Sequence, residues 1–216
     1  MLLKGKGFGI YEFMKKQKIL IMFLILSSFI EGGCLMAFEI LSVKIYTPYL
    51  GNSIYVWTSI LVVTLMGLAV GYRAGGFLAS KESKSSLVYS FLLSGILIFC
   101  STYTVQFFSP VFLSTGIKMA SLIAGFVVLF FPVLLMGIVS PLIVNYLNSI
   151  YLKLSKSAGI VYSIGTLGGI VFVLATVYIF IPGIGVKNTS YLLGSLLMLT
   201  GLLMMLQKMP MAHEKI

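Results

Sequence analysis

The sequence has few charged residues. Only 9% of its 216 residues are charged, whereas a soluble domain carries about 25%. A surface that faces water cannot be built from so few charges, so a lipid bilayer has to solvate most of the exterior. The composition therefore excludes a soluble globular protein. The length accommodates about five to seven spans with short loops, so we expect no separate soluble catalytic domain.

Cysteine and histidine are also scarce. Cys34 and Cys100 both lie inside apolar runs, without a CxxC motif, and His213 stands alone in a polar tail. Metal sites need several such ligands at characteristic spacings. We therefore expect no metal and no cofactor, and we interpret both cysteines as free thiols that pack as small hydrophobic residues.

A continuous basic patch is missing as well, although the net charge is +10. The basic residues lie at the ends of apolar runs and are not interleaved with aromatic residues. This pattern excludes nucleic acid as a partner.

Long apolar stretches make up most of the chain. A helix that crosses the bilayer needs about 20 apolar residues, and in lipid its backbone groups have to be paired within the helix. The sequence therefore predicts an all-α polytopic membrane protein with one transmembrane domain at 19–207, a basic segment at 1–18 and a short tail at 208–216. Six stretches are expected to span: 19–43, 54–72, 85–108, 119–147, 158–181 and 189–206.

The first stretch is expected to be an uncleaved span. Glu31 interrupts it just before Gly32 and Gly33, where a lipoprotein signal would have an apolar residue, and the apolar sequence runs on to Val43. That length exceeds the apolar region of a signal peptide.

Lysine and arginine predict the orientation. With six spans, 12 of the 15 basic residues fall on one side, and only Lys44, Lys118 and Lys187 fall on the other. The basic side faces the cytoplasm. We expect both termini in the cytoplasm and the chain in the inner membrane of a bacterium.

The fourth stretch, 119–147, is longer than an ordinary span and contains Pro132 and Pro141. Each proline removes a helical hydrogen bond. The sequence is compatible with one kinked helix, with a span followed by an interfacial helix, or with a re-entrant pair.

Glycines recur at intervals of four on two of the predicted helices. This spacing places them on one helix face, where a neighbouring backbone can approach closely. We expect helix packing within the chain, or a dimer contact, at Gly67, Gly71, Gly75, Gly165 and Gly169.

Two glutamates lie in the first predicted span. Glu31 is expected near the middle of the bilayer and Glu39 near its outer boundary, about 80° apart around the helix. A carboxyl group at this depth is costly and usually faces a cavity or a partner. Each residue is either functional or a protonated, hydrogen-bonded structural residue.

A polar and aromatic cluster follows Glu39. Its aromatic residues fit an outer membrane belt, but the short turn around Pro48 and Gly51 also suits a loop shaped over a cavity. We predict an outward-opening site for a cationic ligand such as a polyamine, held by charge pairing and by aromatic faces. Besides Glu31 and Glu39, its candidate residues are Lys44, Tyr49, Asn52, Ser53 and Trp57.

Several motifs resemble a known family. The segments EILSVKIYTPYLGNSIYVW (39–57) and GLAVGYRAGGFLAS (67–80), together with FPVLLMGIVSPLIV (131–144), SAGIVYSIGTLGGI (157–170) and IPGIG (181–185), resemble the integral-membrane portion of bacterial spermidine-synthase-like proteins. In fused members, related to major-facilitator proteins, a cytoplasmic aminopropyltransferase domain follows. The resemblance implies roles for Glu39, Lys44, Tyr49, Gly51 and Trp57 in whatever the membrane portion does.

This sequence ends at Ile216 without the glycine-rich motif of the transferase domain, so the resemblance does not imply that catalytic activity here. We expect a membrane module that acts with a partner protein supplied in trans. The alternatives are a transporter or dimeric half-transporter for a small, cationic solute, and a membrane enzyme with an outward-facing site around Glu39.

Overall fold

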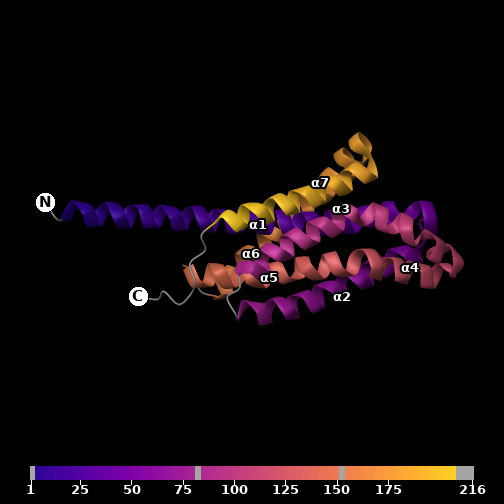
Figure 1. Cartoon of the computed structure of the whole chain (residues 1–216), viewed down its shortest axis with the longest axis horizontal. Coiled ribbons are helices and arrows are strands. Elements are labelled where there is room, and N and C mark those ends of the chain that lie inside the picture. The colour runs from indigo at the N-terminus through magenta and orange to yellow at the C-terminus, as the bar shows by residue number, and fades with distance from the viewer. Residues whose placement is uncertain (1–2, 81–83, 151–153, 208–216) are drawn as a thin grey trace.

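The computed structural model is a bundle of long helices (Figure 1) and describes residues 3–80, 84–150 and 154–207. Every element in these ranges is helical, as the composition predicts. Two short π-helical segments, η1 and η2, interrupt the α-helices. The elements are α1 (Leu3–Leu50), α2 (Ile54–Ala79), α3 (Lys84–Ser114), α4 (Ile117–Gly125), η1 (Phe126–Phe130), α5 (Phe131–Ile150), α6 (Leu154–Ala175), η2 (Thr176–Phe180) and α7 (Ile181–Leu206).

Five helical stretches in the described ranges are long and apolar enough to cross a membrane. They are Gln17–Leu50, Ile54–Ala79, Lys84–Pro110, Ile117–Ile150 and Leu154–Leu206. The number differs from the six predicted because the last two predicted spans belong to one helical stretch of 53 residues. Gly185 interrupts this stretch with φ 82° and ψ 166°, a conformation that favours glycine because a Cβ would clash with the backbone.

The first helix is longer than predicted. It begins at Leu3, so it includes most of the basic segment predicted at 1–18, and it continues through Pro48 to Leu50. Gly51 ends it with φ 70° and donates its N–H to the carbonyl of Thr47 at 3.0 Å. This is a common way to close a helix. In Figure 1 the N-terminal part of α1 projects beyond the other helices.

The fourth predicted stretch forms one continuous helical segment, Ile117–Ile150. Its wide π-helical turn η1 ends two residues before Pro132, and η2 likewise ends two residues before Pro182. A proline has no N–H to donate and its ring crowds the preceding turn. A π-helical turn is one way in which a helix accommodates this disturbance.

The helices pack in three pairs. In the first, α1 runs parallel to α6, with Gly32 against Gly165 and Met36 against Gly169. In the second, α2 runs parallel to α5, with Gly71 against Gly137.

The third pair, α3 and α7, is antiparallel. Gly95 contacts Gly194, and the hydroxyl of Ser190 donates to the carbonyl of Ile98 at 2.6 Å. At the end of the pair Lys84 donates to the carbonyls of Met205 (2.8 Å) and Gln207 (2.5 Å). These two bonds join the start of α3 to the end of α7.

Candidate functional site

A cavity of about 420 Å³ lies between α1, α2, α5 and α6. Its polar lining residues are Glu31, Tyr72, Ser140, Tyr162 and Thr166. Its other lining residues are Gly32, Leu35, Met36, Leu68, Val161, Gly165, Gly169, Ile170, Val173 and Leu174.

Glu31 is the acidic residue of this cavity. Its side chain is 4% exposed. It lies 14 residues into the span that begins at Gln17, which is about 21 Å along the helix. This places the carboxyl group near the middle of the candidate span. Polar groups at this depth are usually paired or face a cavity.

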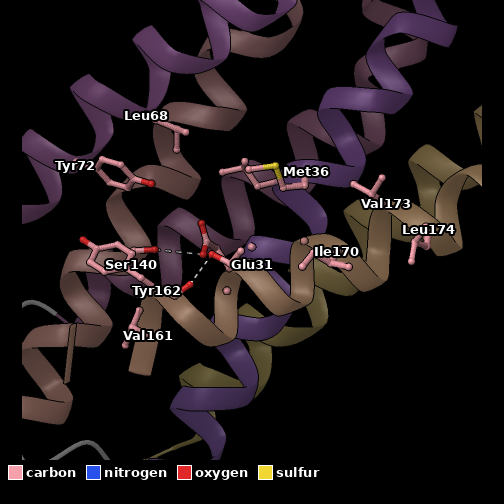
Figure 2. Close-up of a pocket in the computed structure, with 15 residues that line it drawn as sticks. Glu31, Met36, Leu68, Tyr72, Ser140, Val161, Tyr162, Ile170, Val173 and Leu174 are labelled. Carbon is pink, nitrogen blue, oxygen red and sulfur yellow. Dashed lines mark hydrogen bonds between the residues drawn. The ribbon is translucent and has the colours of Figure 1, made fainter. Parts of the chain in front are cut away.

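Ser140 is the hydrogen-bond partner of Glu31. Its hydroxyl donates to Glu31 Oε2 at 3.3 Å, from α5 to α1, and Figure 2 shows this bond as a dashed line. Ser140 is itself buried. The bond therefore links two helices inside the bundle and fixes the carboxyl group toward the cavity.

Glycines of the cavity lining lie where α1 and α6 contact each other. A Cβ on Gly32 would overlap the carbonyl oxygen of Gly165, and a Cβ on Gly169 would lie 2.9 Å from Met36 Cγ. At Gly32 and Gly165 the backbones of α1 and α6 therefore touch directly, while Gly169 makes room for the side chain of Met36. Close approach of this kind is what small residues at helix contacts provide.

Two tyrosines form the aromatic part of the lining. Tyr72 on α2 and Tyr162 on α6 face each other edge to face, with ring centroids 6.5 Å apart and an interplanar angle of 78°. Their side chains are 41% and 47% exposed. The cavity is therefore open on the side between α2 and α6. Figure 2 shows Tyr72, Ser140 and Tyr162 grouped around Glu31.

The remaining lining is apolar. Leu35 and Met36 come from α1, Leu68 from α2, and Ile170 and Leu174 from α6. A ligand of this cavity would therefore meet one carboxyl group, a few hydroxyls, two aromatic faces and an apolar wall. Aromatic faces attract cations, and a carboxylate pairs with one positive charge. The chemistry suits a small molecule with one cationic group and an apolar body.

The structure separates Glu39 from this cavity. Glu39 is half-buried and Lys44 is exposed on α1, and neither lines the cavity around Glu31. The helix continues unbroken past both residues to Leu50. Within the described ranges the two side chains form no ion pair with each other.

The other predicted ligand-binding residues lie at the turn between α1 and α2. Tyr49 is half-buried at the end of α1, while Asn52 and Ser53 belong to the turn itself. Trp57 donates its indole N–H to Asn52 Oδ1 at 2.8 Å, and the carbonyl of Ser53 accepts the N–H of Val56 at 3.1 Å. The turn is therefore held by its own hydrogen bonds.

The predicted packing glycines lie at helix contacts. On α2, a Cβ at Gly67 would lie 3.0 Å from Val133 Cγ1, and one at Gly75 would lie 2.7 Å from the carbonyl oxygen of Ile138. A Cβ at Gly71 would overlap the carbonyl oxygen of Leu134.

Sequence reasoning missed Ser140, Tyr72 and Tyr162. A signal existed for the tyrosines, because Tyr72 directly follows Gly71 and Tyr162 precedes Gly165 by three residues. At about 100° per residue, Tyr72 lies about 100° and Tyr162 about 60° around its helix from the packing glycine, which places each ring beside the helix contact. Ser140 gave no comparable signal, since serine is common inside apolar helices.

Comparison with protein-family models, curated proteins and solved structures gives no match. The chain is therefore interpreted from its own residues, and the resemblance to spermidine-synthase-like membrane domains stays a prediction.

Proposed function

We propose that this chain is a transporter module for a small organic cation, and that Glu31 pairs with the charge of the solute inside the cavity. The cavity itself carries the proposal. It combines a buried carboxyl group at mid-span with the faces of Tyr72 and Tyr162 and an apolar wall. Intramembrane ionisable residues that face cavities typically belong to solute or proton pathways.

The cavity favours a monocation over a polyamine. Glu31 is the one acidic residue in its lining, so a second ammonium group would have no countercharge there. An apolar body, by contrast, would contact Leu68, Ile170 and Val173. This refines the ligand class expected from the sequence.

Six crossings with both termini in the cytoplasm of a bacterium remain part of the proposal. A straight helix of the 53 residues in Leu154–Leu206 would be about 80 Å long, whereas the hydrocarbon core is about 30 Å thick. The break at Gly185 supports two crossings instead. The hydrogen bonds from Lys84 to the end of α7 support a topology in which the start of α3 and the end of α7 lie on the same side of the membrane.

The arrangement of the helix pairs also supports transport. If Leu154–Phe180 and α7 cross separately, they are spans five and six, and Ile117–Ile150 is span four. The helix pairs are then spans one and five, which are parallel, spans two and four, which are parallel, and spans three and six, which are antiparallel. A two-fold axis in the membrane plane could relate the two halves of the chain by placing span one on span four, span two on span five and span three on span six. The pair of spans one and five would then become the pair of spans four and two, and the pair of spans three and six would become itself. Inverted repeats of this type are common in transporters, and their solute sites lie between the repeats.

A protein partner in trans is a second proposal, and the open side of the cavity supports it. Tyr162 and Ile170 on α6, like Tyr72 on α2, are exposed there. A further subunit would close this side of the cavity. The subunit would be a spermidine-synthase-like protein, as the family resemblance implies, or a second copy of this chain.

Uptake into proteoliposomes tests the transport proposal. We expect purified wild-type protein to accumulate radiolabelled benzyltrimethylammonium, a monocation with an apolar ring. Glu31→Gln should reduce uptake to that of protein-free vesicles, because glutamine has nearly the same shape but cannot carry the charge.

Glu39→Gln is the matched variant, since Glu39 lies on the same helix but outside the cavity. We expect it to retain uptake. If Glu39→Gln abolishes uptake while Glu31→Gln does not, the outer site predicted from the sequence is the functional one and the proposal for Glu31 is wrong.

A further inference from the structure

Glu31 lacks a positive partner in the described part of the chain. No lysine or arginine lines its cavity. The titratable groups that face it are Tyr72 from α2 and Tyr162 from α6. α5 contributes Ser140 and no charge, and α3 and α7 contribute nothing to the lining.

The thiol of Cys34 is the nearest titratable group on α1 itself, and it is directed elsewhere. Its Sγ lies 3.9 Å from the carbonyl oxygen of Leu193 on α7. Among the described residues Glu31 therefore has one hydrogen-bond donor, the hydroxyl of Ser140 at 3.3 Å, and it shares the cavity with two phenol groups.

One hydrogen bond does not offset the free-energy cost of burying a carboxylate. Removing an unpaired charge from water costs several kcal/mol even after the protein relaxes. A neutral carboxylic acid costs much less, because it needs only hydrogen-bond partners. The hydroxyl of Ser140 serves either form, since it can donate to the carboxylate and accept from the acid.

We propose that Glu31 carries a proton when the cavity is empty and exchanges it for the solute cation, so that each cation that binds releases one proton. The inference rests on the proposed cation site. In the exchange, the O–H bond of the Glu31 carboxyl group breaks and its proton leaves to water. The carboxylate that remains pairs with the cation, and the net charge of the cavity does not change.

Electroneutral exchange of a proton for a monocation follows from this charge balance. The cavity is neutral with either occupant, whereas an empty, charged cavity is disfavoured by the desolvation of Glu31. Movement of the cation in one direction is thus tied to movement of a proton in the other. A pH gradient across the membrane would drive transport without a membrane potential.

Proton release on binding tests the exchange directly. Benzyltrimethylammonium is a suitable probe because it has no titratable proton, so any proton released comes from the protein. The probe is added to detergent-solubilised full-length protein in weakly buffered solution near neutral pH, with bound probe and pH both recorded. We expect about one proton per bound cation, and an affinity for the probe that rises with pH, by up to about tenfold per pH unit, over the range in which the empty site holds its proton.

The Glu31→Gln variant should neither bind the probe nor release protons. If it does not fold, the pH dependence of wild-type affinity still decides the question. Binding without proton release, with affinity independent of pH, overturns the exchange but leaves the cation site intact. Failure of the wild-type protein to bind the probe overturns the cation site and the exchange together.

Discussion

The hydroxyl of Ser140 lies 3.3 Å from Oε2 of Glu31 and joins two helices across 109 residues of sequence. Both side chains are buried, and the cavity lies beside them. This contact joins the fold to the proposed function, since it positions the one carboxyl group of the cavity.

Loss of the Ser140 hydroxyl should destabilise the protein. Ser140→Ala leaves Glu31 without its donor, and an unsatisfied buried polar group costs about 1–3 kcal/mol. We expect a lower midpoint of thermal unfolding in detergent. Ser94→Ala is the control, because Ser94 is also buried and, in the described part of the chain, its hydroxyl donates only to the carbonyl of Phe91 in its own helix, at 3.1 Å. Equal midpoints for the two variants would argue against the role of Ser140.

A bulky residue in place of Gly71 should disturb the contact between α2 and α5. Even the Cβ of Gly71→Ala would overlap the carbonyl oxygen of Leu134, whereas the Cβ of Gly76→Ala has open space within 4 Å. Overpacking typically costs about 1–3 kcal/mol. We expect size-exclusion profiles in detergent to show a lower folded yield for the first variant alone. Similar yields would mean that the two helices separate easily.

The hydrogen bonds between Lys84 and the end of α7 should protect the amides of that helix end from hydrogen exchange. Lys84→Met removes the donor to the Met205 and Gln207 carbonyls. Cations near helix C-termini contribute about 0.3–1 kcal/mol, so amide hydrogen exchange at the end of α7 should accelerate about two- to fivefold. The exposed Lys156 is the control position, and Lys156→Met should leave that exchange unchanged. The same exchange rate in both variants would contradict the prediction.

Reporter fusions test the number of crossings. Fusions after Asn52 and after Lys187 should report the external side, and fusions after Lys84 and Lys156 the cytoplasm. The result at Lys187 is decisive, because it lies just beyond the break at Gly185. If Lys187 and Lys156 report the same side, the stretch Leu154–Leu206 does not cross twice.

The helical character of the chain and the position of Glu31 along its apolar helix could be predicted from the sequence because both follow from local patterns. The length of each apolar stretch predicts a helix that can span a membrane, and counting residues along the first stretch gives the position of Glu31. The glycine spacing likewise identified Gly71 and Gly165, which lie at helix contacts.

The composition of the site could not be predicted in this way. The contact between Ser140 and Glu31 depends on which helices become neighbours, and no local pattern encodes that choice. The sequence instead drew attention to Glu39, because polar residues follow it directly in the chain. In the structure those residues belong to the end of α1 and to the turn that follows it, while the cavity takes its lining from four helices.

Photo-crosslinking locates the bound cation and tests the central claim most directly. An aryl-azide derivative of benzyltrimethylammonium is bound to the wild-type protein and irradiated, and the labelled residues are identified by mass spectrometry. Unlabelled benzyltrimethylammonium in excess should suppress specific labelling. We predict adducts on Met36, Tyr72 and Tyr162, which line the cavity around Glu31. Adducts confined to the outer turn, at Tyr49 and Trp57, would contradict the account.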